Sequence, residues 1–446
     1  MPRLTRYTEC VVTRIRPVCS FGLVLLFAFL VACQREETAQ PESSGATLTV
    51  WAHAGQSSER ETLAQHVTRF NQAHPELQVE VTFIPERSYN AQVQAAAIAG
   101  ELPDILEFDG PYLYNYVWQE HLIALEGLVS AELQNDLLPS VRAQGTYRGR
   151  LYGVGMFDSG LALYARRSLV RQAGVAQLPT HPAQAWTVEE FSHLLRELGG
   201  NDADGAVLDL KFNYPDEWFA YAFSPIIQSA GGDLISRDGY QSADGTLNGT
   251  QAVAAMRALQ DWIGKGLVDA NVDDAAFTSG RVALSWAGHW EYPRYKAAWG
   301  DDLALVPLPD FGRGSRTGQG SWVWGVTRYC RQPRVAADFL EYLLAPEQVL
   351  AMSDSNGAVP ATGTAIQRSP LYREGGPLHL FVVQLSEGYA VPRPQTPGYP
   401  VISNAFRRAF ADIRTMADVQ AALDRAVEMI DRDVRDNRGY PVVAPP

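Results

Sequence analysis

The apolar positions between residues 48 and 108 alternate between two periods. Residues 48–52 and 79–83 carry apolar side chains at every second position, which predicts two strands, and residues 63–70 carry them at helical spacing in between. The composition of residues 91–99 predicts a second helix, and the short apolar run at 105–108 predicts a third strand. This order predicts an α/β fold with a parallel sheet and helices on both faces.

Two later stretches have the character of chain that crosses between two lobes. Glycines interrupt the apolar run of residues 149–165, and the sequence LALVPLP at residues 303–309 is a second candidate crossover. Thr187 and Glu190 have the spacing of a capping box, which predicts a helix start. Further helices are predicted at residues 252–263, 336–344 and 418–433, and a further strand at residues 322–326.

The stretch Phe277–Tyr292, FTSGRVALSWAGHWEY, combines a buried-strand pattern with large aromatic side chains. Its apolar run predicts a strand that ends at Trp286 and Trp290. In open α/β sheets ligands bind just outside such strand ends, which favours an aromatic surface for a flat ligand. The alternative is that both tryptophans are core residues, because aromatic side chains dominate protein cores.

The composition limits the kinds of partner. The 446 residues suggest two or three domains, and the formal net charge of −13 argues against binding to nucleic acid or to anionic lipid by charge. This charge does not discriminate for or against a neutral ligand.

The first residues have the pattern of an export signal. A basic region precedes the apolar core Phe21–Leu30, which is too short to span a membrane, and a small residue precedes Cys33. Leu30–Cys33 resembles the bacterial lipobox, and this resemblance implies cleavage before Cys33 and lipid attachment to its thiol. Residues 1–32 are therefore expected to be a signal peptide, and residues 33–46 a lipidated cysteine with a polar, flexible tether.

The remaining cysteines and the other motifs offer little chemistry. Once the signal is removed and Cys33 is lipidated, only Cys330 remains, so neither an internal disulfide nor a cysteine metal cluster is expected. No dinucleotide loop and no histidine metal motif is present, and no cofactor or metal is predicted. Asp202 and Asp204 resemble part of a calcium loop, but the surrounding positions do not fit an EF-hand, which leaves an irregular calcium site as an alternative.

Two aspartates stand where strands are expected to end. Asp109 follows the strand at 105–108 and precedes Gly110, and Asp158 follows the glycine-rich run of the first crossover. Loops at such positions often carry binding residues. An Asx turn is the alternative for each, because aspartate beside glycine or proline commonly caps a turn.

Taken together, these segments resemble the extracellular solute-binding proteins of carbohydrate ABC importers. The matching segments, in chain order, are Leu48–Trp51, Gly100–Asp104, Gly149–Gly153, Leu163-Tyr164 before Ala173-Gly174, Pro179 with Trp186-Thr187, Phe277 with Gly280–Ala283, and Pro307–Pro309. Residues Arg393–Tyr399 are similar to the trehalose/maltose-binding subgroup. The resemblance implies a two-lobed periplasmic-binding-protein fold of type II, with hinged lobes that each hold a mixed sheet flanked by helices. We expect an N-terminal lobe from residues 47–156 and 306–333, and a C-terminal lobe from residues 157–305 and 334–446.

The resemblance also implies which residues bind the ligand. The expected ligand residues are Glu59, Arg87, Asp109, Asp158, Trp290, Tyr292, Ser321, Trp322 and Arg393. His53 and Gln56 are further candidates in the N-terminal lobe, whereas Trp286 is expected in the core.

The expected function is capture of a sugar by hinge closure and its delivery to the transmembrane subunits of an ABC permease. A disaccharide such as trehalose, maltose or sucrose is the expected ligand. The protein is expected to be a monomer, exported and held by Cys33 at a bacterial membrane, facing the periplasm or the cell exterior. Two alternatives stay open at this point: a secreted glycoside hydrolase that uses Asp109 and Asp158, and a receptor for glycerol phosphate or a polyamine.

Overall fold

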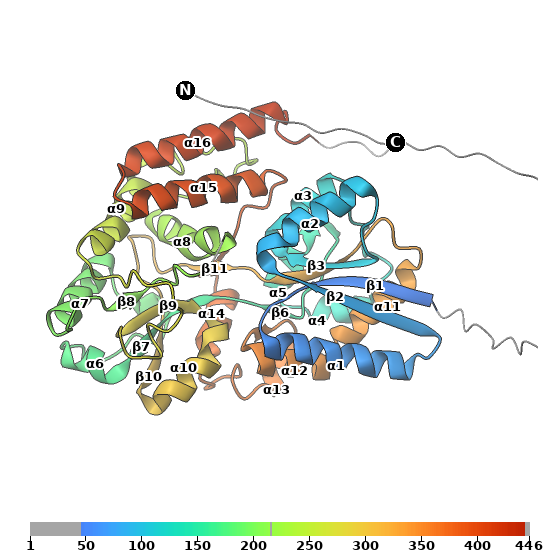
Figure 1. The fold of residues 1–446 in the computed structure, drawn as a ribbon, viewed down its shortest axis with the longest axis horizontal. Helices are drawn as coiled ribbons and strands as arrows, with labels where there is room; N and C mark the ends of the chain where they lie inside the picture. Colours follow the sequence, from blue (N-terminus) through green and yellow to red (C-terminus); the bar gives the residue numbers. More distant parts are fainter. Residues whose placement is uncertain (1–45, 215, 442–446) are drawn as a thin grey trace, which may run out of the picture. The chain divides into compact units, whose positions relative to one another are not determined.

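The computed structural model describes residues 46–214 and 216–441, and Figure 1 shows their ribbon. The predicted signal peptide, Cys33 and the tether up to residue 45 lie outside the described residues. Two four-stranded sheets, each with its own apolar core, divide the described chain into a first lobe and a second lobe.

The first lobe is built on a mixed sheet with the strand order β12-β3-β1-β2. Its strands are β1 (Ala46–His53), β2 (Leu77–Ile84), β3 (Ile105–Asp109) and β12 (Trp322–Val326). β1 pairs in parallel with both β2 and β3, while β12 runs antiparallel to β3. The helices α1 (Ser57–Ala73) and α2 (Glu86–Ala99) connect the parallel strands, so the predicted strand–helix order is confirmed.

Helices cover both faces of this sheet, as the prediction required. Leu63 and Phe70 of α1 pack on one face together with α11 (Pro333–Leu343) and α12 (Pro346–Asn356). Tyr89 and Val93 of α2 pack on the other face, together with α3 (Leu113–Trp118). The parallel strands β1 and β3 end at His53 and Asp109, on the edge of the sheet between these two layers.

The second lobe has the strand order β10-β7-β9-β8. The strands are β7 (Leu161–Arg166), β8 (Leu208–Asp209), β9 (Leu284–Gly288) and β10 (Leu303–Val306). Its larger core involves α7 (Val188–Gly200), α8 (Glu217–Ala230), α9 (Thr250–Gly264), α15 (Tyr399–Arg414) and α16 (Val419–Asp436), and α10 (Tyr292–Trp299) packs on the other face. The predicted capping box of Thr187 and Glu190 opens α7.

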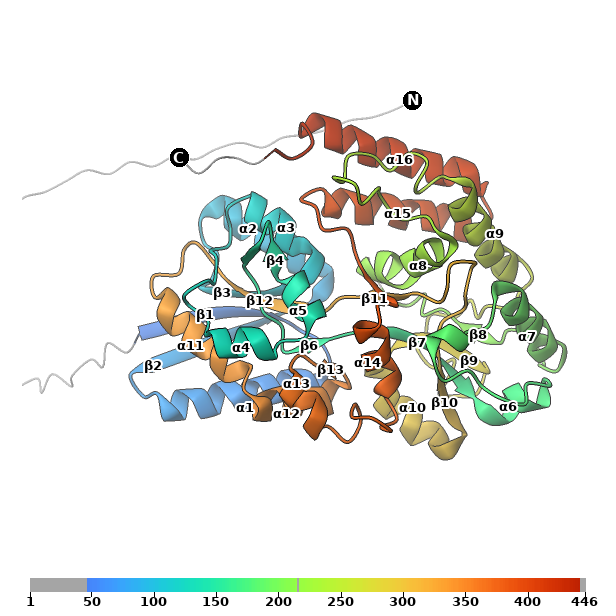
Figure 2. The same ribbon diagram turned by 180° about the vertical axis from the view of Figure 1, so that it is seen from behind.

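Short strands run between the two lobes, as Figure 2 shows from behind. β6 (Phe157–Asp158) leads into β7 and pairs with β13 (Val359–Pro360), while β11 (Thr317–Gln319) pairs with β14 (Ala390–Pro392). The first predicted crossover is therefore confirmed. The second is wrong, because residues 303–306 form the edge strand β10, and the chain crosses afterwards, through β11.

The packing also differs from the expected lobe boundaries. Val306 and Leu308 are buried in the second-lobe core, although residue 306 was expected to begin a return to the N-terminal lobe. Phe339 and Leu340 of α11 are buried in the first-lobe core, although residues after 333 were expected in the C-terminal lobe. The boundaries at 306 and 334 are corrected accordingly.

The remaining elements are short. They are η1 (Gly110–Tyr112), α4 (Ala131–Asp136), α5 (Pro139–Gln144), β4 (Thr146–Tyr147), β5 (Arg150–Leu151), α6 (Arg167–Gln172), η2 (Pro182–Gln184), η3 (His289–Glu291), η4 (Gly300–Asp302), α13 (Gly363–Arg368) and α14 (His379–Ser386). Within residues 46–214 and 216–441, no helix has both the length and the apolar character needed to cross a membrane.

Candidate functional site

Three side chains of the first lobe meet where the strands of its sheet end. His53 and Asp109 are the last residues of the parallel neighbours β1 and β3, and Trp322 begins β12 in register with Asp109. The imidazole of His53 stacks on the indole of Trp322, with ring centroids 3.9 Å apart and planes at 6°. These residues form one wall of the candidate site, at the sheet edge where α/β proteins commonly bind ligands.

Aromatic side chains of the second lobe form the opposite wall. Trp290 follows β9, and its indole folds back over Gly288 so closely that a Cβ there would lie 2.0 Å from the ring. The indole Nε1 donates a hydrogen bond to the Tyr214 hydroxyl at 3.1 Å. The rings of Trp218 and Tyr221 lie 6.0 and 6.2 Å from that of Trp290. Glycine at position 288 is thus required for this arrangement.

Trp286 has a different position from Trp290. It is only 1% exposed and belongs to the second-lobe core, as predicted.

An ion pair joins the two walls. The guanidinium of Arg393, which follows β14, donates to both carboxylate oxygens of Asp109, at 2.6 and 2.5 Å. Both side chains are largely withdrawn from solvent, at 4% exposure for Arg393 and 13% for Asp109. Gln56 makes a second link, because its amide donates to the carbonyl oxygen of Trp290 at 3.3 Å. Four of the sequence-predicted residues are therefore brought together: Asp109, Trp290, Trp322 and Arg393.

We call the Asp109–Arg393 ion pair, with the side chains bonded to it, the junction. Glu217 also belongs to the junction, although no sequence pattern pointed to it. Its carboxylate accepts hydrogen bonds from Tyr399 at 2.5 Å, Ser403 at 2.6 Å, Tyr112 at 2.8 Å and Arg393 at 3.2 Å. Tyr112 comes from the first lobe, so Glu217 links the lobes as well. A glutamate in the first turn of a helix is usually explained by the helix dipole, and the sequence therefore carries no distinguishing signal here.

A buried charge network supports His53 from behind. The ring Nδ1 lies 2.7 Å from Glu107, and Nε2 lies 3.6 Å from Glu59. Burial alone would lower the pKa of His53, but the carboxylates of Glu107 and Glu59 outweigh it and raise that pKa well above its ordinary value of 6.5. Asn356 donates to Glu59 at 3.1 Å. Glu59 therefore contacts His53 and not the space between the walls. The sequence signal for this network was Glu107, because a charged residue inside an otherwise apolar strand is unusual.

Three of the sequence-predicted residues carry buried polar atoms that have no hydrogen-bond partner within residues 46–214 and 216–441. These atoms are Oδ2 of Asp158, Oγ of Ser321 and Nε of Arg393. Asp158 is fully buried in β6, and burial raises its pKa to about 6. Buried polar atoms nearly always have partners, so an atom without one requires an explanation, such as a ligand that supplies the partner.

Two predicted residues stand apart from the junction. Arg87 is exposed on the first turn of α2, and Tyr292 packs beside the apolar cluster that contains Tyr295. Among the described residues, no hydrogen bond or ion pair joins either side chain to the walls. A ligand role for Arg87 or Tyr292 stays a prediction.

The acidic turn at residues 202–204 is accounted for by local hydrogen bonds. Oδ1 of Asp202 accepts from the backbone N–H groups of Asp204 and Gly205, at 3.1 and 3.2 Å. In the part of the chain that the structure describes, no group of three or more acidic, histidine or cysteine side chains could hold a metal ion.

Comparisons with known proteins place the chain in a family. Residues 65–375 match the family described as bacterial extracellular solute-binding protein. An uncharacterized lipoprotein from the oleD 5′ region of Streptomyces antibioticus is 24% identical over 428 residues, covering 90% of each chain. The maltodextrin-binding protein MdxE of Bacillus subtilis is 21% identical over 426 residues, covering 91% of this chain and 94% of its own.

A solved structure agrees with this result. The GacH receptor of Streptomyces glaucescens, known unliganded and with acarbose, has a TM-score of 0.73 and 21% identity, covering 88% of this chain and 98% of its own. The two-lobed type II fold expected from the sequence is thereby confirmed. The matched family consists of binding proteins and not of enzymes, which removes the glycoside hydrolase alternative. This chain belongs to the bacterial extracellular solute-binding protein family.

Proposed function

We propose that this protein is the sugar receptor of an ABC importer, held at a bacterial membrane by a lipid on Cys33. The named relatives support this proposal, since one is a lipoprotein and another binds maltodextrin. The observation that carries it is the junction itself, where Asp109 of the first lobe and Arg393 of the second form a buried ion pair between two aromatic walls.

The chemistry of the two walls suits a sugar. A pyranose has hydroxyl groups around its edge and apolar C–H faces, so it needs polar groups beside flat rings. Asp109 can accept from hydroxyls, and the fork of Arg393 can donate to neighbouring hydroxyl oxygens, with charge-assisted bonds that are roughly twice as strong as neutral ones. Trp290 and Trp322 offer the rings.

Buried atoms without partners suggest where further hydroxyl groups bind. A hydroxyl that donates to Oδ2 of Asp158 or Oγ of Ser321, or accepts from Nε of Arg393, would satisfy an atom that has no partner among the residues that the structure describes. Glu59, Arg87 and Tyr292 are proposed as secondary contacts, with Glu59 acting through His53.

Closure follows from contacts made to both lobes. A ligand that binds Asp109 on one lobe and Trp290 on the other stabilises the closed arrangement in proportion to its preference for that state. The closed protein then docks on the permease subunits as a monomer and releases the sugar. No covalent step is required.

The proposed ligand is a disaccharide such as maltose, trehalose or sucrose. The test is isothermal titration of the purified protein with these three sugars and with maltotriose, together with thermal unfolding. We expect binding of at least one sugar, and Trp290→Ala should weaken it by about 1–3 kcal/mol through lost ring contact.

Matched controls separate ligand contact from folding. Trp299→Ala is the control for Trp290→Ala, because Trp299 is a half-buried tryptophan that stacks on Arg166 outside the site. Asp301→Asn is the control for Asp109→Asn, because it removes an exposed carboxylate. Equal losses in site and control variants would contradict the proposal. If the protein binds none of the sugars but binds spermidine or glycerol 3-phosphate, with an affinity that falls strongly as salt is added, the alternative of a receptor for a charged solute is favoured.

A further inference from the structure

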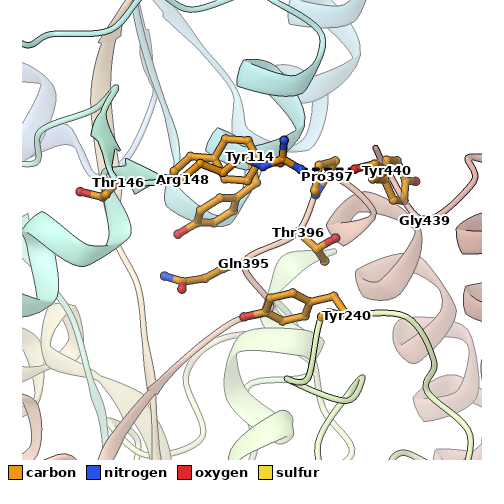
Figure 3. A pocket seen from close by; sticks show the side chains of 11 residues that line it. Tyr114, Thr146, Arg148, Tyr240, Gln395, Thr396, Pro397, Gly439 and Tyr440 are labelled. Carbon is orange, nitrogen blue, oxygen red and sulfur yellow. Dashed lines mark hydrogen bonds between the residues drawn. The ribbon is translucent and has the colours of Figure 1, made fainter. Parts of the chain in front are cut away.

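A pocket lies between the lobes, apart from the Asp109–Arg393 ion pair. It encloses about 290 Å³. It is lined by Tyr114, Thr146, Tyr147, Arg148, Gly239, Tyr240, Gln395, Thr396, Pro397, Gly439 and Tyr440. None of the predicted ligand residues is among these, so the pocket has its own set of side chains. Figure 3 shows the rings of Tyr114 and Tyr240 on different sides of the pocket, with the Gln395 side chain between them.

Three left-handed turns present side chains to this pocket. Both residues have positive φ in Arg148–Gly149 (52° and 78°), in Gly239–Tyr240 (68° and 56°) and in Gly439–Tyr440 (72° and 56°). A positive φ is uncommon for residues other than glycine, and for a bulky side chain it is a real strain. Such strained residues cluster at functional sites, where the surrounding structure maintains them. The Arg148–Gly149 turn joins the β4–β5 hairpin and Gly439–Tyr440 follows the end of α16, so local chain geometry accounts for these two, and their consequence is that they place Arg148 and Tyr440 at the pocket.

Two of the tyrosines that line the pocket are held in place by hydrogen bonds from their hydroxyl groups. The hydroxyl of Tyr114 donates to the carbonyl oxygen of Gln144 at 3.2 Å, and that of Tyr440 donates to Asp433 at 2.5 Å. The rings of Tyr114 and Tyr147 lie edge to face at 5.6 Å. Anchored rings lose little conformational freedom when a ligand binds, which favours affinity.

The pocket is adjacent to contacts that hold the lobes together. Asn115, next to Tyr114 on α3, donates to the carbonyl oxygen of Pro397 at 2.8 Å across the lobes. Tyr112 and Tyr399 meet edge to face at 5.6 Å between the same two segments. These contacts join residues 112–115, at the end of η1 and the start of α3, to residues 397–399, just before and at the start of α15.

We infer that this pocket is a second saccharide-binding site, sized for a single pyranose ring. Its volume is close to the lower end of the range of about 300–1,000 Å³ for small-molecule sites, so it suits one ring and not a long chain. Tyrosine rings provide stacking surface for the C–H faces, while Gln395, Thr146 and Arg148 provide donors and acceptors for ring hydroxyls. The inference does not depend on which solute the junction binds.

Variants of the two sites can test this separately. Tyr240→Asn removes a pocket ring and keeps a residue that tolerates positive φ, and Gln395→Leu removes the amide at similar size. Asp109→Asn alters the junction, and Tyr329→Ala, an exposed tyrosine outside this pocket, is the control. Glucose, galactose, mannose and xylose are the probes, observed by saturation-transfer NMR and titration with the purified protein.

We expect the Asp109→Asn protein to keep binding at least one monosaccharide, and each pocket variant to weaken this binding by about tenfold. The affinity of the junction for its own ligand should stay within about twofold in the pocket variants. Monosaccharide signals that vanish with Asp109→Asn, or that persist unchanged in folded Tyr240→Asn and Gln395→Leu, would overturn the inference. Failure of the junction to bind sugars would leave these signals intact, so the two proposals fail separately.

Discussion

The fully buried carboxylate of Asp158 leads to a pH-dependent prediction. Oδ1 accepts from the backbone N–H of Ser159 at 2.7 Å, whereas Oδ2 has no hydrogen-bond partner among the described residues. Burial raises the pKa of this carboxyl from its ordinary 3.8 to about 6, and it outweighs the opposite effect of the nearby Ser140 and Gln319 side chains and of the Ser159 and Gly320 N–H groups. The ionised form is therefore less favourable in the folded protein than in the unfolded chain at neutral pH. Asp158→Asn removes this cost while keeping the shape of the side chain.

The magnitude follows from the shift. Roughly two pKa units correspond to at most about 3 kcal/mol. Since the folded pKa lies above the unfolded one, the contribution to stability is fully present below pH 3.8 and is lost as the pH rises through about 6. Relative to wild type, the Asp158→Asn protein should gain up to about 3 kcal/mol in the free energy of unfolding between pH 4 and pH 7.

Urea unfolding at pH 4, 5, 6 and 7 measures this difference. Asp301→Asn, at an exposed carboxylate, is the control and should show no such trend. A difference between Asp158→Asn and wild type that stays constant over this range would refute the reasoning.

The same variant tests a ligand role for Asp158. A sugar hydroxyl that donates to Oδ2 favours the ionised carboxylate, so wild-type affinity should fall as the pH drops below about 6. The Asp158→Asn protein should bind more weakly and without this pH dependence. Equal affinities at every pH would show that Asp158 is a hinge residue only.

Three further changes have defined outcomes. Gly288→Ala should displace the Trp290 ring, because the new Cβ would lie 2.0 Å from that ring. Ligand titration of this variant should show about tenfold weaker binding than wild type. Unchanged ligand affinity together with unchanged tryptophan fluorescence would contradict the contact. Because the pKa of His53 is raised in the folded protein, its contribution to stability is fully present below pH 6.5 and is lost as the pH rises through the folded pKa. The Tm of wild type should therefore fall above pH 6.5, and the Tm of His53→Asn should fall less steeply. Parallel curves of Tm against pH for the two proteins would exclude this linkage. Glu217→Gln should lower the free energy of unfolding by about 1–3 kcal/mol, because the Glu217 carboxylate accepts four buried hydrogen bonds. Glu76→Gln, at an exposed glutamate, is the control in the same denaturation experiment. Equal losses in the two variants would argue against a structural role for the four hydrogen bonds.

The sequence patterns predicted the elements of the first lobe well because each rests on local information. Period-two apolar positions gave β1 and β2, and the run at 105–108 became β3, since side-chain alternation follows directly from strand geometry. The helix predicted at 336–344 also exists as α11. Its membership of the first lobe was missed, because an amphipathic face requires a partner surface but does not specify which sheet provides it.

The candidate site divides in the same way. The sequence alone determined that Asp109 stands at the end of a strand and that Trp290 follows one, because strand and turn signals lie within a few residues of each. Only the tertiary structure decided that Asp109 meets Arg393, 284 residues further along, and that Glu217 joins them. It also decided that His53 lies between two carboxylates and that three left-handed turns converge on one pocket. The physical reason is that such contacts join residues far apart in the chain and depend on how the two lobes pack against each other. Short-range periodicity carries no information about that packing.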